Sequence, residues 1–254
     1  ALPATSSVFA VSGIQLLSPV GEEVWGAGTD CLVTWTGGGF DNVRVEITRD
    51  GSWTDTETVA GPIAIADGQC TCTIAGPGTT DCLLRVSDWD DGVPSHQTAS
   101  SLTLASIGVV APAGGDTWDS DSLQTIEWNS IGVTAVDVEL SRDGNWVDGD
   151  GSNVESLAVS RDASLATLPW TPGMPVSATC LIRVSDSADV AQSAVSSTFA
   201  VGGMQLLSPV GGEVLCRSQT YEITWLYVGG AGTVDIEYTE DTSGDPGTWV
   251  WNVI

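Results

Sequence analysis

Six cysteines are the residues of this chain that could react with one another. Cys31 and Cys82 lie in two strand-like stretches of one repeat, in phase with inward-facing residues, so we expect their sulfurs to meet across a core as a disulfide. Cys72 is the competing partner for either sulfur. The bond would close a loop of about 52 residues, stabilise the fold by about 4 kcal/mol and indicate an oxidising compartment. Cys180 and Cys216 lack such a partner, and we expect unpaired thiols or inter-chain links.

Two acidic turns are the candidates for a metal site. Asp88, Asp90 and Asp91 gather in the first turn, and Asp148 and Asp150 in the second. Carboxylates among turn residues suit Ca²⁺, a hard cation that takes about six to eight oxygen ligands. Neither turn has the spacing of an EF-hand. Solvated acidic turns are therefore the first interpretation and calcium the second, and no other cofactor is expected.

Catalytic patterns are weak throughout the sequence. The one histidine, His96, lies in a polar stretch, and no Gly-x-Ser-x-Gly motif accompanies it, so a Ser-His-Asp hydrolase is not expected. An acidic chain offers many carboxylate pairs for glycoside hydrolysis, but no one set of them recurs from repeat to repeat. We therefore expect no enzymatic activity.

The charge of the chain is one-sided. Thirty-three acidic residues stand against seven basic ones, which gives a formal net charge of −26. Such a surface repels nucleic-acid phosphates and anionic lipid headgroups. No stretch reaches the roughly 20 apolar residues that a membrane-spanning helix needs. We expect a well-solvated acidic protein with no nucleic-acid partner and no membrane insertion.

The elements that position these residues come in repeats. Segments 6–24, 100–118 and 196–214 are copies of one sequence, and each contains two short strand signals with only Gly or Ser between them. Each copy is interpreted as a junction, at which the last strand of one module passes into the first strand of the next. The predicted modules of about 100 residues are 13–105 and 106–202, with 203–254 as a partial module and 1–12 as the closing strand of a preceding or neighbouring one.

Within each module the apolar pattern is that of strands. Apolar and polar residues alternate over short runs, and Gly, Pro, Asp and Ser cluster between the runs. The inward face of one such run carries Cys31, Val33 and Trp35. Asp-Gly at 50–51 and 143–144 predicts tight hairpins, since Gly supplies the positive φ they need. The fold class is therefore all-β, with tandem immunoglobulin-like β-sandwich modules, two complete and one partial.

Several motifs together carry a family resemblance: LLSPVGGEV, a strand ending in Trp, the Arg-Asp-Gly turn, and CLIRVSD. In this order they resemble the N-terminal domain of the Ser-Thr-rich GPI-anchored cell-wall family of fungi. They are also similar to the tandem immunoglobulin-like or fibronectin-like modules of bacterial secreted and surface proteins. The resemblance covers nearly all of the chain and rests on strand and turn patterns. It implies an extracellular β-sandwich that serves as a spacer, wall or adhesion module.

The two terminal segments suggest how modules meet. The N-terminal segment matches a closing strand, and the C-terminal segment is an apolar edge that could pair with another strand. The candidate assembly residues are Val8, Phe9, Val11, Trp249, Trp251 and Ile254. We expect a structural subunit of an extracellular filament, sheath or surface layer. Copies of the chain would assemble into a homopolymer by strand complementation, or the chain would be part of a longer tandem array.

The alternative function is a carbohydrate-binding or adhesive module of a large secreted protein, with polysaccharide as the partner. The reason for this alternative is the high number of tryptophans, eleven in all, because indole rings can stack on sugars. Trp25, Trp53, Trp89 and Trp146 lie near predicted turns, where they could either cover strand edges or stack on sugar rings. Packing is the first interpretation of these four and sugar binding the second.

Overall fold

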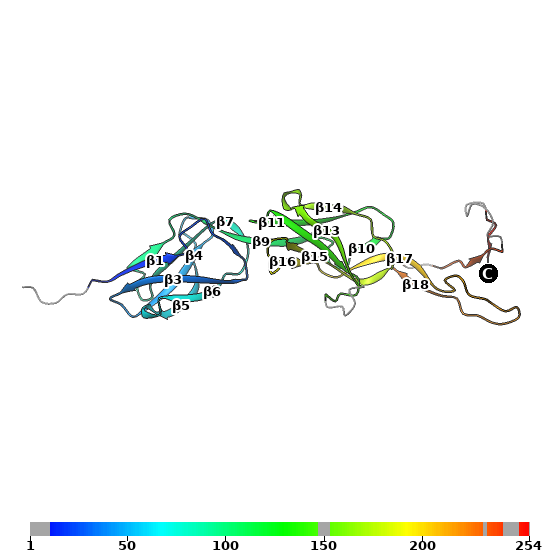
Figure 1. Ribbon diagram of the computed structural model, residues 1–254, viewed down its shortest axis with the longest axis horizontal. Coiled ribbons are helices and arrows are strands. Elements are labelled where there is room, and N and C mark those ends of the chain that lie inside the picture. The colour runs from blue at the N-terminus through cyan, green and yellow to red at the C-terminus, as the bar shows by residue number, and fades with distance from the viewer. Residues whose placement is uncertain (1–10, 147–152, 231–232, 241–248, 254) are drawn as a thin grey trace, which may run out of the picture.

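The computed structural model describes residues 11–146, 153–230, 233–240 and 249–253. Strands make up nearly all of the regular structure in these ranges, together with two single-turn 3₁₀ helices, η1 (Ile65–Asp67) and η2 (Ala163–Leu165). Among the described residues no helix is long and apolar enough to cross a membrane. The chain is therefore all-β, as the alternating pattern predicts, and its β-structures follow one another in a row (Figure 1).

The first β-sandwich packs two mainly antiparallel sheets face to face. One sheet has the order β1-β3-β6 and the other continues from β9 through β7 and β4 to β5. The short strands β2 (Val24–Gly26) and β8 (Ser95–Gln97) join the second sheet at β9 and β7. The longer strands are β1 (Gly13–Ser18), β3 (Asp30–Gly38), β4 (Asn42–Thr48), β5 (Glu57–Ala64), β6 (Gln69–Thr73), β7 (Thr79–Asp88) and β9 (Leu102–Ala111).

The second β-sandwich repeats this arrangement. One sheet holds β14, β11 and the second half of β9, and the other has the order β10-β17-β15-β12-β13 with β16 beside β15. Its strands are β10 (Thr117–Asp119), β11 (Gln124–Ile131), β12 (Ala135–Ser141), β13 (Val154–Asp162), β14 (Thr167–Trp170), β15 (Ser177–Asp186), β16 (Ser193–Val195) and β17 (Phe199–Ser208).

Each sandwich encloses its own core, centred on a tryptophan. Trp35 and Trp128 are each only 2% exposed. The indole N–H of Trp35 donates to the carbonyl of Ile65 (3.1 Å), and that of Trp128 to the carbonyl of Ala163 (3.2 Å). A buried indole needs a partner for its N–H, and in both modules the 3₁₀ turn presents a carbonyl at that place. Each 3₁₀ turn therefore supplies the hydrogen-bond acceptor that the buried indole of its module needs.

The third β-structure is more open in its described residues. The second half of β17 pairs with β18 (Thr224–Val228), and β19 (Glu237–Tyr238) pairs with β20 (Asn252–Val253). Trp225 corresponds to the two buried core tryptophans but is 40% exposed, and Leu206 is 52% exposed where its counterpart Leu16 is 5% exposed. This repeat presents an apolar sheet face that the first two repeats bury.

Candidate functional site

Strand β9 belongs to both complete sandwiches. Its first half pairs antiparallel with β7, where Leu102 lies opposite Cys82, and parallel with β2, where Leu104 lies opposite Trp25. Its second half pairs antiparallel with β11, from Ser106 opposite Ile131 onward. The sequence predicts two short strands at this place, but the backbone runs through as one. A single sheet consequently spans the two modules.

Strand β17 repeats this arrangement at the next junction. Its first half pairs with β15 and, in parallel, with β10. Its second half pairs antiparallel with β18, where Leu206 lies opposite Trp225. Two successive junctions are therefore built in the same way, by a strand that closes one module and opens the next (Figure 1).

The apolar alternation of these strands shifts by one residue at the junction. In β9, Leu102 and Leu104 are buried in the first core, whereas Ile107 and Val109 pack against the second. Successive residues of a strand point to opposite faces, so the step from even to odd positions moves the apolar side chains to the other face. β17 carries the same shift, because Phe199 and Val201 are buried and the next apolar positions are Met204 and Leu206. The shift lets one strand serve two cores.

A glycine four residues after each core tryptophan packs against the end of the preceding module. Gly39, Gly132 and Gly229 all have positive φ, at 91°, 69° and 80°. A Cβ on Gly132 would lie 2.6 Å from Thr103 Cγ2 and 3.2 Å from Ala105 Cβ. Gly39 meets the Cα of Ser12, and Gly229 meets Thr117 Cγ2 of β10 and the Cα of Gly202 in β17. Only glycine fits this turn and this approach without strain.

A glutamine closes the junction between the two complete modules. Gln192, in the turn between β15 and β16, is 7% exposed. A Cβ added to Gly26, at the end of β2 in the first module, would fall 2.1 Å from the side-chain nitrogen of Gln192. The Gln192 amide therefore lies directly against Gly26, in the space that a side chain there would need. Gln192 is a polar residue in a turn, so nothing in the sequence indicates that its side chain is buried at a junction.

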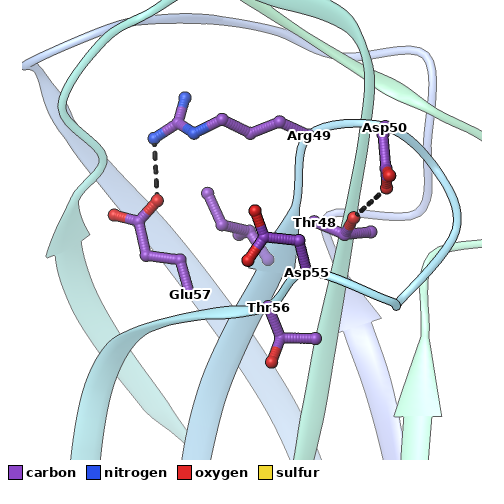
Figure 2. Close-up of a pocket in the computed structure, with 7 residues that line it drawn as sticks. Thr48, Arg49, Asp50, Asp55, Thr56 and Glu57 are labelled. Carbon is purple, nitrogen blue, oxygen red and sulfur yellow. Dashed lines mark hydrogen bonds and ion pairs between the residues drawn. The ribbon is translucent and has the colours of Figure 1, made fainter.

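The Arg-Asp-Gly hairpin of the first module lines a cavity of about 200 Å³ (Figure 2). Arg49 donates to Glu57 (3.0 Å) and to the carbonyls of Ala75 (2.7 Å) and Pro77 (2.6 Å), so it ties the hairpin to the loop before β7. Asp50 accepts from Thr48 and Ser52, and these hydrogen bonds lower its pKa to about 2. These polar groups brace the turn, but the predicted tight hairpin is wrong, because β4 ends at Thr48 and β5 begins only at Glu57. Asp50 and Gly51 therefore lie in a longer loop.

The same face of each complete module carries a glutamate, an arginine and a tryptophan in contact. Arg85 donates to Glu46 (2.9 Å) and lies 4.3 Å from the ring centroid of Trp53. In the second module Arg183 donates to Glu139 (2.6 Å) and lies 4.4 Å from the Trp146 ring. The remaining two tryptophans of the sugar-binding alternative, Trp25 and Trp89, pack against the first core and Gly61 respectively. All four rings therefore have protein contacts.

The acidic turn at Asp88, Asp90 and Asp91 is held by its own hydrogen bonds. Asp88 accepts from the backbone N–H of Asp90 (2.8 Å) and Asp91 from that of Val93 (2.9 Å). Within the ranges that the structure describes, no group of three or more His, Cys, Asp or Glu residues is placed to hold a metal ion. Asp148 and Asp150, the second calcium candidate, lie outside the described residues. Both interpretations of the acidic turns, as solvated turns and as calcium sites, stay predictions.

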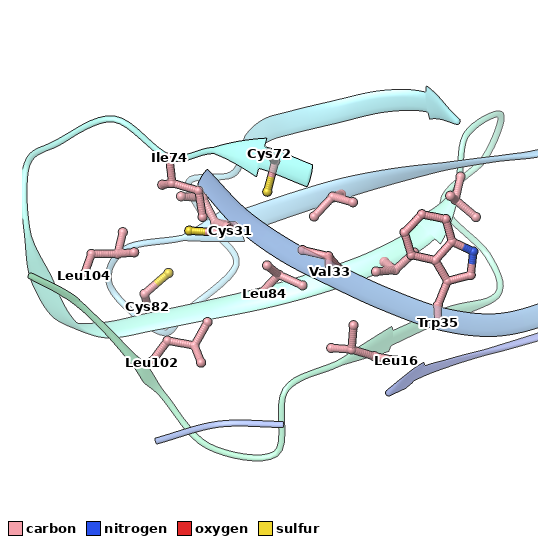
Figure 3. Close-up of a cluster of buried hydrophobic side chains, with 14 residues drawn as sticks. Leu16, Cys31, Val33, Trp35, Cys72, Ile74, Cys82, Leu84, Leu102 and Leu104 are labelled. Atoms are coloured by element: carbon pink, nitrogen blue, oxygen red, sulfur yellow. The ribbon is translucent and has the colours of Figure 1, made fainter. Parts of the chain in front are cut away.

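All six cysteines are free thiols in this structure, so the disulfide between Cys31 and Cys82 stays a prediction. Cys31 lies on β3, directly opposite Cys72 on β6, whereas Cys82 lies on β7 in the facing sheet (Figure 3). The thiol of Cys31 is directed to the carbonyl of Thr29, 3.6 Å away. Cys180 is a buried thiol in the second module, and Cys216 is exposed in the third.

The predicted assembly strands are only partly described. Val8, Phe9 and Ile254 lie outside the described residues, while Val11 is 79% exposed and Trp251 49% exposed. The rings of Trp249 and Trp251 contact each other, with centroids 6.0 Å apart. The residues that follow them form β20, which pairs with β19 through Asn252 and Tyr238. One side of this predicted free edge is therefore already paired.

The sequence matches no protein-family model and no curated protein. Similar solved structures include the fibronectin(III)-like modules of Clostridium thermocellum CbhA (16% identity, 74% of this chain, 92% of that chain, TM-score 0.24), DIP-gamma IG1+IG2 (10%, 74%, 97%, 0.31) and the N-terminal four Ig domains of Dscam1 isoform 9.44 (11%, 76%, 46%, 0.28). Identities and TM-scores this low carry no argument about activity or partner. The fold rests on the sheets and cores described above, and the similarity to the fungal cell-wall family is not shown.

Proposed function

We propose that the chain is a structural, non-enzymatic subunit of an extracellular filament, sheath or surface layer. Its units are the immunoglobulin-like modules 13–105 and 106–202, with 1–12 and 203–254 as parts of further units. The observation that carries the proposal is that β9 and β17 each lie in two successive modules. A chain built in this way holds its modules in a fixed line, which is what a spacer or filament requires.

Three kinds of contact stiffen the junction between the two complete modules: strand pairing, the packing of Gly132 and the packing of Gln192. A linker of flexible residues leaves the distance and angle between domains variable, whereas the strand at this junction is hydrogen-bonded on both of its halves. Gly132 packs on Thr103 and Ala105, and Gln192 packs on Gly26. To bend at Ser106 the chain would have to break strand pairing and expose these contacts to water. Bending is therefore costly compared with bending of a free linker.

The tryptophans favour a structural role over sugar binding. A ring that stacks on a sugar must offer a free face, but Arg85 and Arg183 cover faces of Trp53 and Trp146. The acidic surface, with a net charge of −26, favours solubility and disfavours nucleic acid or anionic membranes as partners. Copies of the same module are the partners that this proposal expects.

Small-angle X-ray scattering and electron microscopy of the purified chain test the proposal. We expect one elongated particle with a single inter-module angle, and end-to-end polymers as the concentration rises. Globular monomers with modules that move independently would contradict it. A glycan array run beside these measurements separates the alternative, because specific polysaccharide binding without polymers would favour an adhesive module.

A further inference from the structure

Three buried thiols lie together at one end of the first core. Cys31, Cys72 and Cys82 are 3%, 5% and 0% exposed, and their side chains lie among Ile74, Leu102 and Leu104 (Figure 3). Cys70 lies two residues before Cys72 on the same strand and is half-buried. Nothing in the proposed structural role accounts for so many thiols in one module.

The second module provides the comparison. The position of Cys31 is taken by Gln124 and that of Cys72 by Trp170, since each pair lies opposite in the same register. Trp170 there packs on Trp118, with ring centroids 6.1 Å apart, and Trp118 packs on Phe199 at 5.3 Å. Only the third thiol is repeated, as Cys180. The first module thus has a pair of thiols where the second has a glutamine and a large aromatic ring.

Sheet geometry decides which two sulfurs can be joined. The backbone N–H of Trp35 donates to Gly68 (2.8 Å); because hydrogen-bonded and non-hydrogen-bonded pairs alternate along an antiparallel ladder, Cys31 and Cys72 are a hydrogen-bonded pair. Such pairs have Cα atoms about 5.5 Å apart, which lies within the range of about 4.4–6.8 Å for disulfides. Cys82 lies on β7 in the facing sheet, so a bond from Cys31 to Cys82 would join the two sheets, whereas a bond to Cys72 joins neighbouring strands of one sheet.

We propose that the first module forms a cross-strand disulfide between Cys31 and Cys72 under oxidising conditions, while Cys82 remains a thiol like its counterpart Cys180. The proposal takes its oxidising surroundings from the extracellular role proposed above. Two S–H bonds break and one S–S bond forms. The two electrons and two protons pass to a small disulfide such as oxidised glutathione, which leaves as two thiols. The bond requires the Cys31 thiol to turn away from the carbonyl of Thr29 and the Cys72 thiol to leave its hydrogen bond with Cys70.

The protonation of the thiols indicates when the bond forms. Burial raises the pKa of Cys31, and it raises that of Cys82 to about 11. Thiolates are the attacking species, so these groups react slowly once they are enclosed. The hydrogen bond between Cys70 and Cys72 lowers the pKa of Cys70, which is also the more accessible of the two. The bond should therefore form while the chain folds, with Cys70 as the thiol that remains reactive afterwards.

Peptide mapping tests the assignment. The chain is refolded with reduced and oxidised glutathione, free thiols are blocked, and the protein is cut with trypsin and Asp-N. Cleavage at Arg44 separates Cys31 from Cys72, and cleavage before Asp81 separates Cys72 from Cys82. We expect a linked peptide pair containing Cys31 and Cys72, retained in Cys70→Ala. A link from Cys31 to Cys82, a link to Cys70, or no link in excess oxidised glutathione would overturn the proposal.

Thermal unfolding gives a second readout. A loop of about 40 residues closed by a disulfide should raise the Tm of the first module by about 10 °C or more, and dithiothreitol should remove the increase. Cys72→Ala should lose this dithiothreitol effect, whereas Cys82→Ala and the matched control Cys180→Ala should keep it. The same effect in Cys72→Ala as in the native chain would contradict the assignment. These measurements use purified protein, so their failure leaves the scattering test of the proposed function untouched.

Discussion

One glutamate–arginine ion pair occurs in both complete modules, but its glutamate is buried to a different degree in each. The Glu46 side chain is 8% exposed and contacts Arg44 (3.4 Å), Arg85 (2.9 Å) and the Ser87 hydroxyl. Its counterpart Glu139 is 27% exposed and bridges Arg183. A buried carboxylate that loses its partner keeps the cost of desolvation, whereas a partly exposed one is rehydrated. Burial, more than the presence of the ion pair, should therefore decide what each arginine contributes.

Replacing the two arginines tests this difference. We expect Arg85→Ala to lower the free energy of unfolding of its module by about 2–4 kcal/mol, because Glu46 loses its closest cation in a buried place. Arg183→Ala, the matched change in the second module, should cost about 1 kcal/mol or less. Urea unfolding with hydrogen exchange assigns each loss to a module. Equal losses in the two modules would refute the argument from burial.

At the residue scale the sequence predicts much of the core and little of the surface network. The alternation around Val33 and Trp35 indicates which side chains turn inward, and both are buried. The pairing of Glu46 with Arg85 joins residues 39 positions apart, so no local pattern reports it. The same holds for the proposed disulfide, since several cysteines in one module indicate that sulfurs share a core without showing which strands lie side by side.

At the scale of elements, the junctions depend on turns as much as on the shared strands. The loop after β11 can approach β9 only because Gly132 has positive φ and no side chain. A glycine four residues after Trp35, Trp128 and Trp225 is visible in the sequence, so this contact had a detectable signal. What the glycine touches was not detectable, because Thr103 and Ala105 belong to the preceding module.

Gly132→Val therefore tests the junction without touching either core. Valine at positive φ is strained and its side chain would overlap Thr103, so we expect a loss of about 2–4 kcal/mol in the free energy of unfolding. Scattering should also report a wider spread of inter-module angles. Gly173→Ala is the control, since a Cβ there meets nothing within 4 Å. A Gly132→Val chain as stiff and stable as the control would show that the contact does not hold the junction.

At the scale of the whole molecule, charge opposes compactness. With a net charge of −26, most carboxylates lack a cation, and repulsion among them should outweigh the few ion pairs that the arginines make. Raising NaCl from about 0.01 M to about 0.5 M shortens the screening length from about 30 Å to under 10 Å. We therefore expect the Tm to rise with salt. A Tm that falls would mean that ion pairs such as Arg49 with Glu57 dominate.

The strand common to adjacent modules also fixes rotation. Since β9 keeps one backbone direction while it passes from the first sandwich to the second, the sideways turn of the second sandwich relative to the first is set by the twist of ten residues, Leu102 to Ala111. β17 applies an equivalent step at the next boundary. A succession of such units would wind about a screw axis, and its pitch would be encoded in the twist of a single β-strand.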